Sequence, residues 1–218
     1  MAELNPDELT VAERYKLLIG SIVPRPIGFV STVSPGGALN LAPYSFFNGV
    51  GSDPMMVLFC PANKNDGHEK DSLRNARPEG EGGVGQFVIN VASEPYITRV
   101  AAAAEPLEHG VSEFELVGLT PEGSSVVRPP RVAESPVSFE CETDRIISTN
   151  PGAPAGGNVV MGRVVHVRVR DDLLNERRHV DQAGLAAVGR MGGLQYCRTR
   201  ERFELPPNSG ALDHRPFG

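Results

Sequence analysis

The sequence predicts a mainly β protein, an antiparallel barrel with short helices at its periphery. About six or seven short segments are rich in β-branched and aromatic residues, which is the composition of strands. Most of these segments follow one another through turns, so they are expected to pair as hairpins. The 24 glycines and 19 prolines supply many turn positions. The regular strand–helix alternation of a doubly wound nucleotide-binding fold is missing, and that fold is therefore not expected.

The first elements of the chain are a short helix and a hairpin. Residues 11–19 (VAERYKLLI) carry apolar side chains at three- and four-residue spacing, which predicts a helix. Pro24 ends this region because proline disfavours helical backbone at the preceding residue. Residues 27–33 (IGFVSTV) and 39–48 (LNLAPYSFFN) flank the turn sequence SPGGA. This arrangement predicts two antiparallel strands joined by a short loop.

The middle of the chain adds strands and a capped helix. Residues 54–60 (PMMVLFC) and 86–92 (QFVINVA) are short apolar runs that predict buried strands. Residues 70–75 (KDSLRN) predict the start of a helix with Asp71 or Ser72 at its N-cap.

Two long alternating segments dominate the second half. Residues 137–147 and 159–169 alternate apolar and polar side chains, which predicts long antiparallel strands joined by the loop NPGAPAGGN. Residues 94–105 and 181–188 are expected to be short helices.

Charge and cysteine content exclude several classes. The formal net charge is -6, which argues against sequence-independent nucleic-acid binding. No segment approaches the roughly 18 apolar residues of a membrane span, and the first residues lack the pattern of a signal peptide. The 3 cysteines form no CxxC pair. We therefore expect a cytoplasmic protein without nucleic-acid or membrane partners.

The common catalytic motifs are missing as well. The sequence GGVG at 82–85 precedes a strand instead of opening a helix, so it is not expected to bind a dinucleotide. No GxSxG elbow occurs, and no two histidines have the i, i+4 spacing of a zinc helix. Neither a metal site nor a hydrolytic triad is predicted.

One region combines the groups that bind phosphate. Arg25 lies in a stiff Pro-Arg-Pro segment, Ser31 and Thr32 place hydroxyls at a strand end, and residues 40–47 mix small, polar and aromatic side chains. Residues 70–72 add a cation and a hydroxyl at a predicted helix start. Such groups could hold an anionic ligand. The same residue types also fit a plain hairpin, a turn and a capped helix, and residue types alone leave both interpretations open.

The order of these blocks resembles the flavin reductase-like family with the FMN-binding split barrel. The resemblance extends from about residue 15 to residue 207, in a sub-branch with RPI, NLAPYSFF and RxGGxxY blocks. It lies in residues 25–57, 70–75, 86–92, 135–141, 157–169 and 189–206. It implies a six-stranded antiparallel split barrel that acts as a homodimer, with FMN near the interface. Residues 1–218 are then one domain with short extensions at both ends.

The resemblance also assigns site residues. It places Ser31 and Thr32 near the flavin. It implies a ring-lining segment that uses mostly backbone groups, made of Asn40, Ala42, Pro43, Tyr44, Ser45 and Phe46. It implies a ribityl-phosphate site made of Arg25, Lys70, Asp71 and Ser72. Arg190 and Tyr196 match a C-terminal block near the site. Lys64 and His68 lie in a polar stretch whose position suggests that it borders the phosphate.

The implied activity is hydride transfer from NADH or NADPH to flavin, with reduced flavin passing to a monooxygenase partner. That transfer needs no general base, so no catalytic side chain is assigned. The alternative is an electron carrier or oxygenase-like flavoprotein with permanently bound FMN and a protein donor. A third interpretation is a barrel that has lost its flavin. The sequence does not specify the nicotinamide or the final acceptor.

Overall fold

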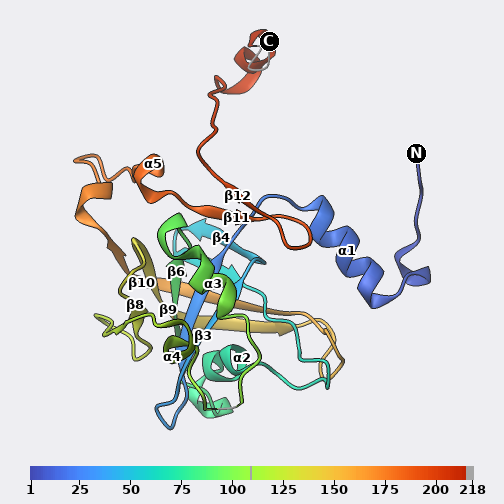
Figure 1. Cartoon of the computed structure of the whole chain (residues 1–218), viewed down its shortest axis with the longest axis vertical. Coiled ribbons are helices and arrows are strands. Elements are labelled where there is room, and N and C mark those ends of the chain that lie inside the picture. The colour runs from blue at the N-terminus through green and yellow to red at the C-terminus, as the bar shows by residue number, and fades with distance from the viewer. Residues whose placement is uncertain (109, 215–218) are drawn as a thin grey trace.

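A computed structural model describes residues 1–108 and 110–214. Its centre is one antiparallel sheet of seven strands, in the order β3-β2-β6-β9-β10-β5-β4 (Figure 1). The strands are β2 (Gly28–Val33), β3 (Leu39–Tyr44), β4 (Phe47–Ser52), β5 (Met55–Phe59), β6 (Gln86–Val91), β9 (Val137–Ser148) and β10 (Asn158–Val169). β3 and β4 stand at opposite ends of this order, yet only Ser45 and Phe46 separate them in the chain. The sheet therefore curls into a barrel, as predicted, with one strand more than the expected six.

The predicted hairpin is present, and its second strand is shorter than expected. β2 pairs with β3 from Gly28↔Tyr44 to Val33↔Leu39. The single strand expected over 39–48 is wrong, because the chain leaves β3 after Tyr44 and pairs with β5 as β4. A Cβ on Gly28 would lie 2.9 Å from the Phe47 ring, so a glycine there lets the start of β4 pack closely on β2.

β3 is an edge strand, and its outer side is unusual. The Leu41 N–H points away from β2, because it donates to a side chain outside the sheet, Glu113. Alternation along the strand gives Pro43 the same outward side as Leu41. Proline has no N–H, so this position is one where an edge strand tolerates it.

The long strands confirm the alternation seen in the sequence. β9 and β10 pair antiparallel from Val137↔Val169 to Ser148↔Asn158, with irregular register at Met161/Gly162 and between Val164 and His166. Two groups of buried side chains fill the barrel and its flank. One includes Phe59, Phe87 and Val160. The other includes Phe29, Leu41, Tyr96 and Phe114.

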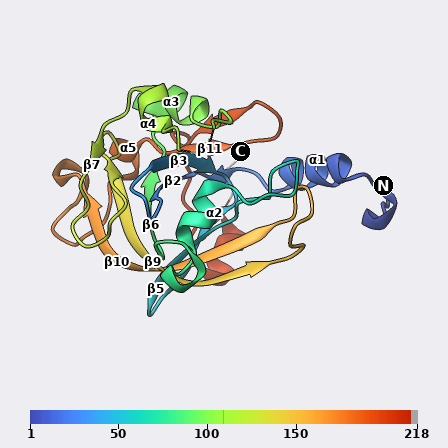
Figure 2. The ribbon, with the colours of Figure 1, turned by 90° about the horizontal axis from the view of Figure 1, so that it is seen from below.

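The described residues contain five short α-helices: α1 (Val11–Ser21), α2 (Asp71–Ala76), α3 (Ile97–Ala102), α4 (Glu113–Val117) and α5 (Gln182–Leu185). α2, α3 and α4 gather around β2 and β3 (Figure 2). The predicted N-cap of α2 is wrong by one or two positions. Lys70 is the N-cap, and Asp71 and Ser72 are the first helical residues. α4 was not expected.

Smaller strands complete the structure. β1 (Arg25–Pro26), β11 (Val188–Arg190) and β12 (Tyr196–Arg198) form a small sheet. β7 (Pro121–Glu122) and β8 (Arg131–Val132) form another. The β11–β12 hairpin was not expected, because it lies in a polar stretch without the pattern typical of strands.

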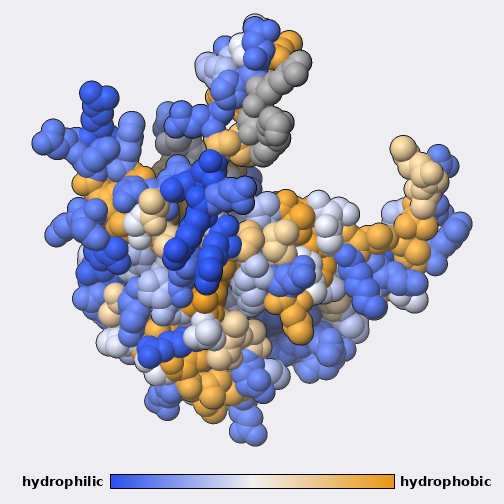
Figure 3. Space-filling model, turned by 45° about the horizontal axis from the view of Figure 1, so that its top comes forward, coloured by the Kyte–Doolittle hydropathy of each residue, from blue (hydrophilic) through white to orange (hydrophobic). Residues whose placement is uncertain are grey.

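Both ends of the described chain project from the barrel (Figure 1). α1 begins with a capping box between Thr10 and Glu13 and buries only Ile19. Figure 3 shows apolar surface along this projecting arm, to which the exposed side chains of Val11, Tyr15, Leu17, Leu18 and Ile22 belong. Within residues 1–108 and 110–214, no helix combines the length and apolar character that crossing a membrane requires.

Candidate functional site

A cavity of about 220 Å³ lies between β3, the start of α2, the segment after α3 and the start of α4. Most of the ring-lining and phosphate-binding residues expected from the sequence meet here. They are Asn40, Ala42, Pro43, Tyr44, Lys70, Asp71 and Ser72. The other lining residues are Lys64, residues 103–107 and Glu113. A depression of about 460 Å³, lined by Lys64, Asp66, His68, Glu69 and Arg74, shares Lys64 with it. Lys64 and His68 are therefore both near the predicted phosphate region.

Lys70 gives the cavity its positive charge. Its ammonium lies 5.7 Å from the centre of the Tyr44 ring, which is within the range of a cation–π contact. Burial lowers the pKa of Lys70, and the charge of Lys64 lowers it further. In the part of the chain that the structure describes, neither lysine forms an ion pair with a carboxylate. Lys70 as a residue is exposed to solvent in the single chain, so an anionic ligand could reach its ammonium and form a charge-assisted hydrogen bond with it.

Two hydroxyls close the cavity wall beside Lys70. The Tyr44 hydroxyl and the Ser72 hydroxyl are 2.5 Å apart, and both residues are buried. Burial raises the pKa of Tyr44, so its hydroxyl stays protonated at neutral pH. Asp71 also lines the cavity and forms an ion pair with Arg74 at 3.4 Å. The predicted Lys70–Ser72 block is therefore one continuous wall.

Asn40 is held in the wall by a small amide network. Its side-chain N–H donates to Thr32 Oγ1 at 3.2 Å, and Asn75 of α2 donates to the same oxygen at 3.1 Å. This network ties α2 to the β2–β3 hairpin. Thr32 thus supports the cavity through Asn40 without lining it.

Ser31 lies on the opposite face of β2 from Thr32, because neighbouring strand residues alternate. Its hydroxyl donates to the Pro130 carbonyl at 2.5 Å and accepts from Asn90 at 3.2 Å. Ser31 is fully buried, and it does not line the cavity.

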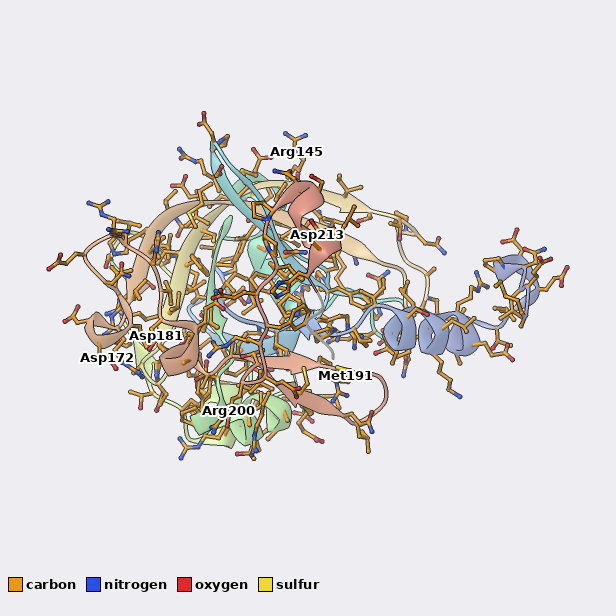
Figure 4. The ribbon with its side chains drawn as sticks, turned by 90° about the horizontal axis from the view of Figure 1, so that it is seen from above. Arg145, Asp172, Asp181, Met191, Arg200 and Asp213 are labelled. Carbon is orange, nitrogen blue, oxygen red and sulfur yellow. The ribbon has the colours of Figure 1, made fainter. Side chains whose placement is uncertain are left out.

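Arg25 and Ser45 form a second group, away from the cavity lining. The Arg25 guanidinium donates to the carbonyls of Ile19 (2.6 Å), Ile22 (2.7 Å) and Met191 (3.0 Å) and to the Ser45 hydroxyl (3.2 Å). Figure 4 labels Met191 at the β11–β12 hairpin. Arg25 thus joins the end of α1 to that hairpin.

Arg190 belongs to the same region. It is the strand partner of Arg25 in the β1–β11 pair. Its guanidinium lies 4.4 Å from the centre of the Tyr196 ring and donates to the Gly193 carbonyl at 2.6 Å. Neither Arg25 nor Arg190 lines the cavity, and their assignment to the flavin stays a prediction.

Glu113 is the lining residue that sequence reasoning missed. It begins α4, and its Oε2 accepts the Leu41 N–H at 2.8 Å. Burial is the main reason that the pKa of Glu113 is raised, and the Asp71 charge adds to it. The available signal was Ser112 before a short apolar run that ends at Gly118, a pattern typical of a capped helix. That pattern predicts the helix but not its contact with β3.

This geometry suits the binding of a flat ligand with an anionic end. The cavity is smaller than the roughly 300–1,000 Å³ typical of ligand pockets, so a nucleotide would extend beyond it. A lysine that forms no ion pair within residues 1–108 and 110–214, two hydroxyls and an amide border one cavity at the edge of a sheet. These groups can bind and orient a ligand through hydrogen bonds and charge.

Comparison with known proteins agrees with the fold and extends it to a family. The model of the flavin reductase like domain matches residues 19–184. An uncharacterized protein from Halalkalibacterium halodurans is 38% identical over 204 residues, which cover 93% of this chain and 95% of that one.

Two crystal structures are similar over nearly the whole chain. Nitrilotriacetate monooxygenase component B from Bacillus cereus is 37% identical, with a TM-score of 0.86 over 94% of this chain and 98% of that chain. The 2-nitrobenzoate 2-nitroreductase from Pseudomonas fluorescens is 30% identical, with a TM-score of 0.83 over 95% and 97%. The curled antiparallel sheet, the family match and these relatives agree, and the chain belongs to the flavin reductase-like family of split-barrel oxidoreductases.

Proposed function

We propose that this chain is an FMN-dependent oxidoreductase that takes a hydride from NADH or NADPH and delivers reduced flavin to a monooxygenase. The observation that carries the proposal is the pair of lysines at the cavity, Lys70 and Lys64, neither of which has a carboxylate partner among the described residues. A phosphate group would supply the missing negative charge through charge-assisted hydrogen bonds. FMN has such a phosphate at the end of a flat ring system.

The cavity residues support the proposed orientation of FMN. The phosphate would bind at Lys70, Lys64 and Ser72, and the ring would lie along Asn40–Tyr44. When bound, FMN supplies the redox chemistry, namely an acceptor for the hydride of a reduced nicotinamide. The protein's own residues hold the phosphate, orient the ring and exclude water from one face. No side chain has to move a proton in that transfer, which agrees with the lack of a triad in the sequence.

We also propose that the working form is a homodimer. The apolar side chains exposed on α1 would lose contact with water if they packed on a second copy of the chain. The cavity is smaller than FMN, so part of the ligand would be covered by a second surface. Sedimentation at micromolar concentration tests this point, and a monomer would contradict it.

The proposed monooxygenase partner is supported by the likeness to nitrilotriacetate monooxygenase component B, whose name describes one component of such a system. A fold of this type hosts several acceptors, so the partner is proposed as a class only.

The first test is spectroscopic. The purified protein is mixed with FMN and its visible spectrum recorded, and NADH and NADPH are then added separately without oxygen. We expect a yellow complex that one of the nucleotides bleaches. A yellow complex that neither nucleotide bleaches would instead favour the electron-carrier alternative with a protein donor. A protein that takes up no FMN would refute the proposal.

The second test addresses the phosphate. Lys70→Ala should weaken FMN binding by about 1–3 kcal/mol, because it removes a charge-assisted hydrogen bond, and should leave riboflavin binding nearly unchanged. Arg177→Ala is the matched control, since it removes one positive charge from an exposed loop outside the cavity lining. An unchanged dissociation constant for FMN in Lys70→Ala would remove Lys70 from the proposed phosphate site.

A further inference from the structure

The Glu113 carboxyl is a buried acid at the wall of the proposed flavin cavity. The residue is only 8% exposed. Its Oε2 accepts the N–H of Leu41, the N–H of Glu113 itself also contacts the carboxyl group, and in the described part of the chain no side chain donates to it. A buried carboxyl group usually has a cationic partner or several donors. Glu113 therefore has acceptor capacity left over at the cavity wall.

Glu113 and Lys70 line the same cavity but do not neutralise each other. No ion pair joins them, so their nitrogen and oxygen atoms are more than 4.0 Å apart. The carboxyl groups of Glu105 and Asp71 also line the cavity. Burial and the charge of Asp71 raise the pKa of Glu113, whereas burial lowers the pKa of Lys70. The protein surroundings of the two groups thus disfavour both charges, and a ligand that contacts both groups would offset this effect.

The chemistry of the two groups defines the ligand that fits them. The lysine takes an anion. The carboxyl group repels an anion and takes a neutral hydrogen-bond donor. FMN carries both: a phosphate at one end, and hydroxyl groups on the ribityl chain and an N–H on the ring elsewhere.

We propose that Glu113 is a positioning residue that accepts a hydrogen bond from a ribityl hydroxyl or the ring N–H of the flavin, and so fixes the ligand with its phosphate toward Lys70. This inference rests on the proposed function, because it assumes that the cavity takes a flavin. It goes further by naming the group that orients the part of the flavin without charge. Through Leu41, the same carboxyl group also fixes the strand on which the ring would lie.

Glu113→Gln separates the two roles of the residue. The amide oxygen can still accept the Leu41 N–H, so the fold should be kept. The amide N–H₂ then faces the flavin donor, and two donors cannot bond to each other. We expect the thermal midpoint to change by no more than about 2 °C, while the dissociation constants of FMN and riboflavin both rise about tenfold or more.

The matched control is Glu115→Gln, which makes the same change on the same helix at an exposed position outside the cavity lining. It should bind both flavins as the wild type does. Lys70→Ala is the contrasting variant, because it should weaken FMN and spare riboflavin. The ratio of the two affinities should therefore fall in Lys70→Ala and stay constant in Glu113→Gln.

The results that overturn the inference are distinct from those that overturn the proposed function. If wild-type protein binds neither FMN nor riboflavin, the proposed function fails. If wild type binds both and Glu113→Gln behaves as Glu115→Gln does, or weakens FMN alone, only the inference fails.

A ligand-side measurement on wild-type protein covers the case in which Glu113→Gln does not fold. Lumiflavin lacks the ribityl hydroxyls, and 3-methylriboflavin lacks the ring N–H. One of the two should bind at least about tenfold more weakly than riboflavin, since one of them has lost the donor. Equal binding of all three flavins would overturn the inference.

Discussion

Replacing Arg25 by methionine tests whether this arginine holds the protein together or holds a phosphate. The guanidinium is 4% exposed and donates to three backbone carbonyls and one hydroxyl. These acceptors belong to the end of α1, the β11–β12 hairpin and the two-residue link between β3 and β4. Methionine fills a similar volume and donates nothing, so all of these contacts end together.

The expected loss in the free energy of unfolding depends on which of these acceptors can form a hydrogen bond with water in the variant. The Ile22 residue is exposed and Met191 is half-buried, so their carbonyls can bond to solvent instead. Ile19 is buried, and its carbonyl loses a partner without replacement. Hydrogen bonds to a charged group contribute about 1.5–3 kcal/mol each, and an orphaned buried acceptor costs about 1–3 kcal/mol. We therefore expect Arg25→Met to lower the free energy of unfolding by about 2–4 kcal/mol.

The assay is urea unfolding, with Arg14→Met on the exposed face of α1 as the control that removes the same charge. Trypsin cleavage at Arg14 and Lys16 should also become faster in Arg25→Met, because α1 loses its anchor. The ratio of FMN to riboflavin affinity should not change. Stability equal to that of the control, together with a selective loss of FMN affinity, would refute this reasoning and return Arg25 to the phosphate site.

Three further predictions concern the cavity and a buried acid. FMN affinity should be constant at neutral pH and fall in alkali as Lys70 loses its proton. The midpoint of this fall should lie below the ordinary lysine pKa, because burial lowers the pKa of Lys70. Measuring the FMN dissociation constant from about pH 7 to pH 10 checks this, and an equal fall in riboflavin affinity would contradict it. Tyr44→Phe leaves the Ser72 hydroxyl without its partner and should cost about 1 kcal/mol in urea unfolding, whereas an unchanged midpoint would show that the hydroxyl finds another partner. Glu140→Gln should lower the free energy of unfolding by about 2–3 kcal/mol. Both oxygens of this fully buried carboxyl group accept backbone N–H groups of residues 125–126 at 2.8 Å, and the amide N–H₂ of glutamine cannot accept in place of the second oxygen. A loss under about 0.5 kcal/mol would exclude that role of Glu140.

Local pattern was enough to predict the elements whose pairing is local. The β2–β3 hairpin and the β9–β10 pair follow from alternation and from the turn residues between the strands. The break after Tyr44 was missed, because residues 39–48 carry strand-forming side chains throughout. What ends β3 is the choice of β5 as the partner of Phe47, which is a tertiary event.

The candidate site also has a part that the sequence could predict and a part that depends on contacts distant in the chain. Asn40, residues 42–44 and residues 70–72 meet at one cavity, while their roles toward a flavin stay a prediction. The family resemblance implied that Arg25 lies at the phosphate, and this stays a prediction. Within the described residues its guanidinium donates to carbonyls of Ile19, Ile22 and Met191, the last of which is 166 positions away in the chain. Glu113 was not predicted as a site residue for a related reason, since its contact with Leu41 joins residues 72 positions apart in the chain. No local pattern reports such distant contacts.

The outer edge of β3 has a consequence for how copies of this protein meet. A free strand edge normally invites another strand, because its N–H and C=O groups can continue the ladder. Here the Leu41 N–H is already occupied by Glu113, and Pro43 offers none. A second chain arriving at this edge would find carbonyl oxygens but lack the alternating donors needed to extend the sheet. Glu113 and Pro43 thus protect β3, the strand that borders the cavity, from pairing with further strands into a fibril. Neither residue blocks the outward carbonyl groups of β3, which a small molecule could still contact.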